Sequence, residues 1–139
     1  AYLFHTRLVR VTEALRDEDP FRALNRITLL ADGFGGGSKI GAALEQFAAT
    51  YARRFVNGRN VVMILSDGYD SAPSDQIACA MERLSRRGCR ILWLNPLKGW
   101  RDYAPVAAGM AAALPWLDLF APAATLEDLA ALERELARL

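Results

Sequence analysis

Two short apolar runs, NVVMILS at residues 60–66 and CRILWLN at 89–95, constrain the fold of this chain more than any other feature. Each run is bounded by glycine or by an Asp-Gly pair and is almost free of polar residues, so we expect two strands covered on both faces. A helical pattern over residues 74–87 separates them, and two strands joined through a helix run parallel. The pair therefore predicts an α/β fold with a parallel sheet.

The same alternation of strands and helices extends through the rest of the sequence. An antiparallel pair of strands is expected at residues 2–5 and 8–12, and another buried strand at 116–121. Helices are expected from Asp19-Pro20 to Gly33, from the glycines that follow to Asn57-Gly58, around residues 103–113, and after a capping box of Thr125 and Asp128. The order predicts one α/β domain that spans residues 1–139.

The composition bounds the kind of protein this is. Hydrophobic residues make up 53% of the chain and charged residues 24%, which is typical of a globular domain with a real core. The 17 basic and 16 acidic side chains leave no charge excess that would favour nucleic acid as a partner. The apolar stretch 104–124 is interrupted by prolines, so no transmembrane segment is expected. Cys79 and Cys89 are interpreted as buried, reduced thiols, which favours a cytoplasmic protein, with a peripheral position at the inner membrane also open.

Two loops contain the residues that could form a functional site. Ligands of an open α/β sheet bind beyond the carboxyl ends of its strands, a position taken here by Ser66-Asp67-Gly68-Tyr69 and by Asn95. The other loop is GFGGGSKIG at residues 33–41. It fits neither the G-x-G-x-x-G dinucleotide pattern nor a Walker loop, in which a glycine rather than Ser38 would precede the lysine.

Ser38 and Asp67 are the candidate ligands of a divalent cation. Taken alone, Ser38 is better interpreted as a helix N-cap, and Asp67 as a turn residue that accepts local backbone N–H groups. Together they offer a hydroxyl and a carboxylate, the hard oxygen ligands that Mg²⁺, Mn²⁺ or Ca²⁺ prefers. Two such ligands do not fill a coordination shell, so water, further protein oxygens or a partner's carboxylate would have to complete it.

The chain resembles von Willebrand factor A (VWA) domains, and specifically their CoxE-like bacterial branch. The resemblance rests on FHTRLVRVTEAL, GGGSKIGAALEQF, VVMILSDGYDS, the block 91–120 and the leucine-rich end. It implies a three-layer, Rossmann-like fold with a mainly parallel sheet, one antiparallel edge strand and helices on both faces. It also implies a metal-ion-dependent adhesion site, with Ser38 in the place of a threonine and Asp67 in the place of an aspartate.

The Asp-x-Ser-x-Ser motif of that family site does not occur in the sequence. By resemblance, the first, central strand and the helix after it are expected to be missing, and metal binding by these residues is expected to be weak or absent. Asp70 has no role that the resemblance assigns, and we expect it to be solvated.

The function that the resemblance implies is a non-enzymatic protein-interaction module. Proteins of this branch are associated with MoxR-type AAA+ ATPases and with the maturation of molybdenum hydroxylases such as carbon monoxide dehydrogenase. The metal would bind an acidic residue of the partner, the ATPase or the client metalloenzyme. The expected partner-binding rim around it consists of Gly36, Gly37, Gly68, Tyr69, Lys98, Trp100 and Arg101.

Two enzymatic alternatives remain open at the level of sequence. In the first, Asp67 accepts a phosphoryl group that Lys39 steadies, although Asp67 and Asp70 have the wrong spacing for an Asp-x-Asp site. In the second, the chain is a nucleotide-binding Rossmann-like domain. No pair of a base and a nucleophile is evident, because we expect His5 at a solvated strand end and Cys79 packed within its helix.

Overall fold

The structure, a computed structural model, describes residues 1–33, 35 and 37–138. In this part of the chain the main sheet consists of three parallel strands in the order β3-β4-β5. The strands are β3 (Val61–Leu65), β4 (Arg90–Asn95) and β5 (Leu119–Pro122). The fold class expected from the alternation, α/β with a mainly parallel sheet, is confirmed.

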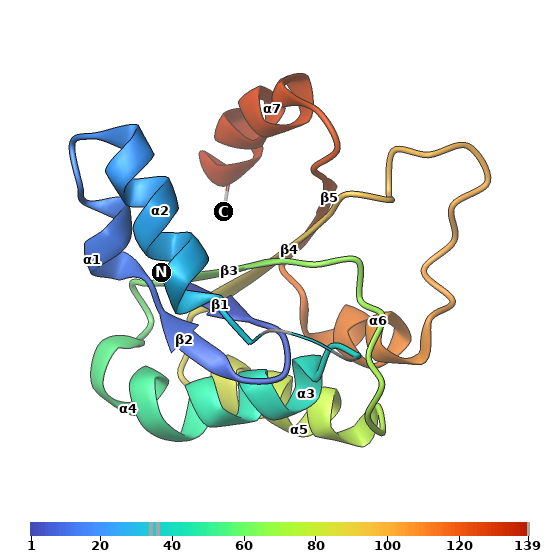
Figure 1. The fold of residues 1–139 in the computed structure, drawn as a ribbon. Coiled ribbons are helices and arrows are strands. Elements are labelled where there is room, and N and C mark those ends of the chain that lie inside the picture. Colours follow the sequence, from blue (N-terminus) through green and yellow to red (C-terminus); the bar gives the residue numbers. More distant parts are fainter. Residues whose placement is uncertain (34, 36, 139) are drawn as a thin grey trace.

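Helices cover both faces of this sheet (Figure 1). On one face lie α3 (Ile40–Gln46), the π-helical segment η1 (Phe47–Tyr51), α4 (Ala52–Phe55), α5 (Asp75–Ser85) and α6 (Ala108–Ala113). On the other face lies α7 (Leu126–Leu136), which begins with the expected capping box of Thr125 and Asp128. The three-layer arrangement of the prediction is therefore present.

Alternate side chains of β4 form two cores, one on each face of the sheet. Ile91 and Trp93 are buried in the larger core with Ile77, Met81 and Met110 and with apolar residues of α3. Leu92 and Leu94 point the other way, into a smaller core with Ala121 and Leu132. The apolar run of β4 thus has the double coverage that its sequence predicts.

The prediction of double coverage is wrong for β3. Val62 and Ile64 are buried, whereas Val61, Met63 and Leu65 are 48%, 47% and 60% exposed. Within the described residues β3 pairs with β4 alone, so it is an edge strand. Because α7 packs against β5 and the second core holds no β3 residue, one face of β3 stays open.

The N-terminal strands pair with each other as expected, in a ribbon of their own. β1 (Tyr2–Phe4) runs antiparallel to β2 (Leu8–Arg10), with Leu3 opposite Val9. This ribbon is a separate two-stranded sheet in the described structure, not an edge strand of the parallel sheet. The Tyr2 ring holds it against the helical layer, at centroid distances of 5.2 Å from Phe47 and 4.7 Å from Tyr51.

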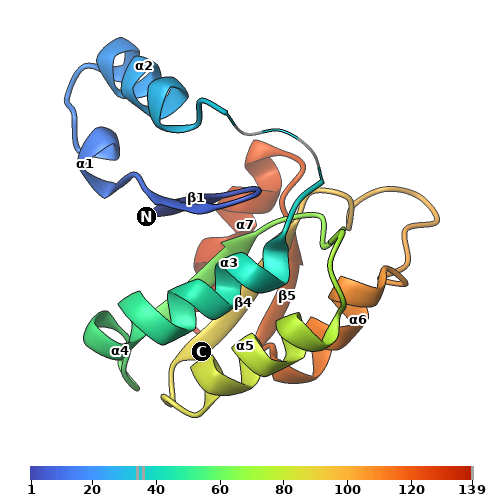
Figure 2. The same cartoon turned by 60° about the horizontal axis from the view of Figure 1, so that its bottom comes forward.

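Two helices follow the ribbon and lie beside it in both views (Figures 1 and 2). They are α1 (Thr12–Leu15) and α2 (Pro20–Leu30). The Asp19 carboxylate caps α2 as the sequence predicts, accepting from the N–H groups of Phe21 and Arg22. None of the eleven residues of α2, all described, is buried.

The segment between β4 and β5 is less helical than expected. The predicted helix over 103–113 begins only at Ala108, and Pro105 disfavours helical geometry at Ala104 before it. A short 3₁₀ turn, η2 (Leu114–Trp116), precedes β5. No helix in the described ranges is long and apolar enough to cross a bilayer.

Candidate cation-binding site

Ser38 and Asp67 line one hollow of about 420 Å³ at the C-terminal end of β3. Tyr2 and Phe4 of β1 form one wall of the hollow, and Met63 and Leu65 of β3 contribute to another. The two residues are 29 positions apart in the sequence, Ser38 just before α3 and Asp67 just after β3, and the fold brings both to the same hollow. This is the end of the sheet at which α/β folds bind ligands.

Asp70, and not Ser38, binds the N-terminus of the helix after the glycine loop. The residue before α3 is Lys39, and no side chain of its own caps the helix. The Asp70 Oδ2 atom instead accepts the Gly41 N–H at 2.7 Å, while its Oδ1 atom accepts the Ala72 N–H at 3.0 Å. The N-cap interpretation of Ser38 is therefore wrong, and so is the expectation that Asp70 is solvated.

A second contact ties the same two loops together. The Ser38 carbonyl accepts two hydrogen bonds from Ser71, one from its backbone N–H at 3.0 Å and one from its hydroxyl at 2.8 Å. A Cβ atom on Gly37 would lie 2.9 Å from the Ser71 Cβ atom, so the close approach of the loops requires glycine there. Asp70 and Ser71 thus form a latch that fixes the backbone of Ser38 against the Asp67 loop.

Two buried side chains of β4 hold the backbone of the Asp67 loop. The Trp93 Nε1–H donates to the Ser66 carbonyl at 2.8 Å, and the Asn95 amide donates to the Asp67 carbonyl at 3.0 Å. Gly68 completes the turn with a φ of +82°, in the left-handed region that favours glycine. The Asp67 carboxylate accepts the Tyr69 N–H at 3.1 Å through Oδ1, as the turn interpretation predicts.

Asn95 is fully buried and has all of its polar atoms paired. Its amide nitrogen also lies 2.8 Å from the Tyr103 hydroxyl, and its Oδ1 atom accepts the Leu97 N–H at 2.8 Å. Burial, with the nearby Tyr69 and Asp67 groups, raises the pKa of Tyr103 above its ordinary value, so this phenol stays neutral at physiological pH. The network links the Asp67 turn to the loop that follows β4.

The donor atoms at this rim suit a hard cation in part. Within the described residues, Asp67 Oδ2 accepts no hydrogen bond, and the Ser38 hydroxyl donates none, so both oxygens are available. The described ranges contain no group of three or more His, Cys, Asp or Glu side chains placed to hold a metal ion. The chain thus supplies two hard oxygens, and a hexacoordinate ion would take its other ligands from water or from a partner.

A family profile described as "VWA domain containing CoxE-like protein" matches residues 1–129. The chain belongs to this family. No curated protein and no solved structure matches the chain significantly. Membership confirms the resemblance drawn from the sequence and makes the chain an interaction module of the VWA type.

The described residues of the rim that the resemblance predicts for this VWA domain are not among those that line the hollow. Tyr69 and Trp100 are 59% and 65% exposed, and Arg101, which follows Trp100 in the chain, is exposed too. Lys98 is half-buried, and its ammonium donates to the Phe120 carbonyl and lies 4.4 Å from the Phe120 ring centroid. Burial lowers the pKa of Lys98.

The glycines of the predicted rim differ in their positions. Gly37 packs against Ser71, and Gly68 is buried beneath Met110, so their backbones shape the loops. Gly36 lies outside the described residues.

The structure of this VWA domain corrects two further predictions made from its sequence. His5 is half-buried in the turn of the ribbon, and its carbonyl accepts the Lys39 N–H at 2.8 Å, so it is not a solvated strand end. Cys79 is exposed on α5, so it is not a packing residue, whereas Cys89 is buried as expected. Sequence reasoning missed the roles of Asp70, Ser71 and Trp93, because their contacts join segments 27 to 33 residues apart.

Proposed function

We propose that this VWA domain captures an acidic residue of a partner protein through a divalent cation held by Ser38 and Asp67. The observation that supports the proposal is that the Ser38 hydroxyl and an Asp67 carboxylate oxygen, neither hydrogen-bonded within the described part of the chain, come from two loops joined by Asp70 and Ser71 and line one hollow. Mg²⁺ is the expected ion, with Mn²⁺ and Ca²⁺ as alternatives of the same chemistry. The bound ion would supply positive charge to which a partner's carboxylate coordinates.

The two protein ligands leave the cation under-coordinated. One carboxylate and one neutral hydroxyl neutralise only half of a dipositive charge, so the ion keeps a strong preference for a further anionic oxygen. A partner's aspartate or glutamate meets that preference better than water does. Binding of the free ion to these residues alone is therefore expected to be weak, and binding of ion and partner together is expected to be cooperative.

The chain's own residues also prepare the surface around the ion. The Asp70 carboxylate accepts hydrogen bonds from the Gly41 and Ala72 N–H groups. It is therefore not a second carboxylate ligand in the hollow. Exposed Tyr69 and Trp100 offer large, rigid side chains of the kind that interfaces use as anchors. The proposed activity is recognition, and it needs no base or nucleophile.

By membership of the CoxE-like family, we propose that the partner is a MoxR-type AAA+ ATPase and that the pair acts in the maturation of a metalloenzyme. A molybdenum hydroxylase of the carbon monoxide dehydrogenase type is the expected client. In this scheme the VWA domain binds the ATPase through the cation site, and the ATPase remodels the client metalloenzyme.

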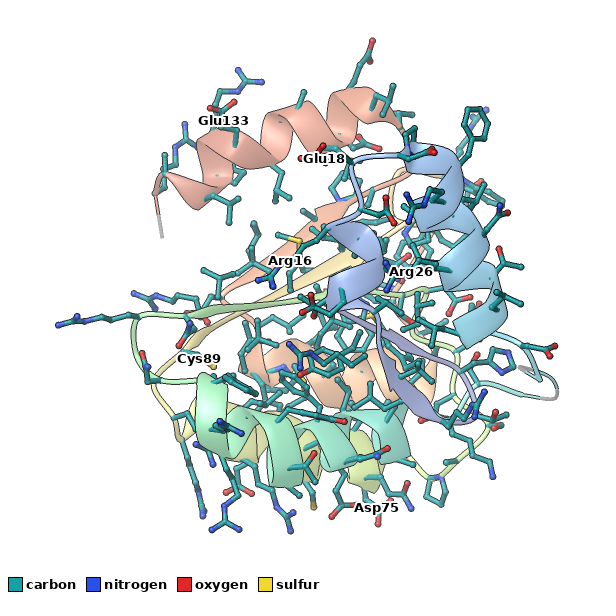
Figure 3. The ribbon with its side chains drawn as sticks, turned by 60° about the vertical axis from the view of Figure 1, so that its left-hand side comes forward. Arg16, Glu18, Arg26, Asp75, Cys89 and Glu133 are labelled. Atoms are coloured by element: carbon teal, nitrogen blue, oxygen red, sulfur yellow. The ribbon has the colours of Figure 1, made fainter. Side chains whose placement is uncertain are left out.

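The test is capture of a purified MoxR-type ATPase from the same genome by immobilised wild-type chain. We expect capture in Mg²⁺, loss of capture in EDTA, loss in Asp67→Ala and weakening in Ser38→Ala. Asp75→Ala is the matched control, because Asp75 is an exposed carboxylate on the outer side of α5 (Figure 3). Equal capture by Asp67→Ala and wild type, with unchanged melting temperatures, would refute the cation bridge.

A further inference from the structure

A second hollow, of about 670 Å³, lies at the opposite end of the sheet from Ser38 and Asp67. It is lined by the residues that end α4 and α5, just before β3 and β4 begin, so it adjoins the N-terminal ends of these strands. Four arginines form its rim, Arg53, Arg83, Arg86 and Arg87, and Ala48 and Val56 contribute an apolar floor. We call this feature the arginine hollow.

The rim of the arginine hollow carries unneutralised positive charge. Two of its arginines form ion pairs, Arg83 with Glu45 at 3.3 Å and Arg86 with Glu82 at 2.7 Å. The other two, Arg53 and Arg87, form no ion pair with any described residue. The pairs that exist are surface pairs with exposed guanidinium groups, so even these arginines remain available to another anion.

Helix ends account for only part of this charge. A helix C-terminus carries roughly −0.5 of an elementary charge, so the ends of α4 and α5 together attract about one positive charge. Arg53 and Arg54 lie in the last turn of α4 and Arg83 lies in the last turn of α5, so three guanidinium groups already exceed this charge. With Arg86 and Arg87, the positive charge around the arginine hollow is therefore more than the helix ends alone attract.

The chemistry of the arginine hollow indicates the kind of partner that fits it. Guanidinium groups bind carboxylates through paired, parallel hydrogen bonds. The apolar floor favours a ligand that also carries an aliphatic side chain. An inorganic anion has no such side chain and fits less well. Nucleic acid fits less well, because the described lining contains no aromatic side chain for stacking and the whole chain has a net charge of only +1.

We propose that the arginine hollow is a docking surface for an acidic segment of a partner protein. Carboxylates of the segment pair with Arg53 and Arg87, and an aliphatic side chain between them lies on Ala48 and Val56. This surface is independent of the cation site, because it needs no metal and lies at the other end of the strands. A partner, or two partners, could thus occupy both ends of the domain at once.

The test uses a fluorescein-labelled oligoglutamate peptide with one central leucine and measures its binding to the full chain by fluorescence anisotropy in EDTA. The reference peptide has glutamine in place of every glutamate. We expect the acidic peptide alone to bind, with an affinity that falls as salt rises. The double variant Arg53→Glu with Arg87→Glu should weaken binding about tenfold or more.

The matched control reverses two arginines far from the arginine hollow, Arg16 directly after α1 (Figure 3) and Arg134 on α7. Arg16→Glu with Arg134→Glu changes the net charge equally and should weaken binding less than about threefold. Equal weakening by both double variants would mean non-specific charge attraction and would overturn the proposal. Three other results would also overturn the proposal: equal binding of the acidic and the glutamine peptide, tighter binding of single-stranded DNA than of the acidic peptide, or loss of peptide binding in Asp67→Ala. Circular dichroism and melting curves establish that each variant is folded.

Discussion

Removal of the Asp70 carboxylate tests the latch on which the geometry of the candidate site depends. Asp70→Ala deletes a 2.7 Å hydrogen bond to Gly41 N–H at the start of α3 and a 3.0 Å bond to Ala72 N–H. Loss of a helix-capping side chain costs about 1 kcal/mol, and loss of a charge-assisted bond to a part-buried donor costs about 1.5 kcal/mol or more. Because the losses overlap at Gly41, we expect a decrease in the free energy of unfolding of about 2 kcal/mol.

The assay is urea unfolding followed by tryptophan fluorescence, to which buried Trp93 contributes the signal most sensitive to unfolding, with thermal melting as a second readout. For a chain of 139 residues the entropy of unfolding is about 0.3 kcal/mol/K, so 2 kcal/mol corresponds to a melting temperature lower by about 7 °C. The urea m-value should not change, because the surface exposed on unfolding stays the same. Asp70→Asn, which keeps one acceptor oxygen but no charge, should lie between wild type and Asp70→Ala.

Asp32→Ala is the matched control for this prediction. Asp32 is an exposed aspartate whose carboxylate accepts only the N–H of the next residue, Gly33, among the described contacts. Its removal should change the free energy of unfolding by less than about 0.5 kcal/mol. If Asp70→Ala and Asp32→Ala destabilise the chain equally, the two loops are not held together by Asp70, and the reasoning about the latch is refuted.

Three other predictions follow from the same structure. Gly109→Ala should lower the free energy of unfolding, measured in urea, by about 1 kcal/mol, because the new Cβ would lie 2.7 Å from the Gly68 carbonyl oxygen. Alanine has the better helix propensity, so a stabilised variant would contradict this packing. Iodoacetamide should modify exposed Cys79 at least about ten times faster than Cys89, whose pKa is raised by burial, as read by mass spectrometry; equal rates would contradict the assignment. Amide hydrogen exchange should be at least about tenfold faster in α2, which has no buried residue, than in α5, and similar protection would show that α2 is packed in solution.

Much of the fold could be predicted from local patterns in the sequence. The Asp19-Pro20 start of α2 and the capping box of Thr125 and Asp128 are determined within a few residues, and both were confirmed. The parallel order of β3 and β4 follows from the helix between them. Such features depend on backbone hydrogen bonding and helix geometry close in the chain, which single-sequence patterns capture.

The errors concern features that depend on distant neighbours. An apolar run does not reveal which strand lies at an edge, so the open face of β3 was not predicted. The pairing of Asp70 with Gly41 joins residues 29 positions apart, and a short polar loop gives no signal of it. The position of Cys79 on the exposed side of α5 was missed because only one face of an amphipathic helix is buried. Ser38 and Asp67 were paired by chemistry and resemblance, and the structure places them on one hollow.

The measurement that tests the cation site most directly is paramagnetic broadening of backbone amide signals by Mn²⁺ in a ¹⁵N-labelled chain. Broadening reports proximity to the ion even when binding is weak. We expect the amides of residues 37–41 and 66–71 to broaden together at low Mn²⁺ and to recover in Asp67→Ala but not in Asp75→Ala. Broadening that is confined to one of the two loops, or that persists unchanged in Asp67→Ala, would show that Ser38 and Asp67 do not share an ion.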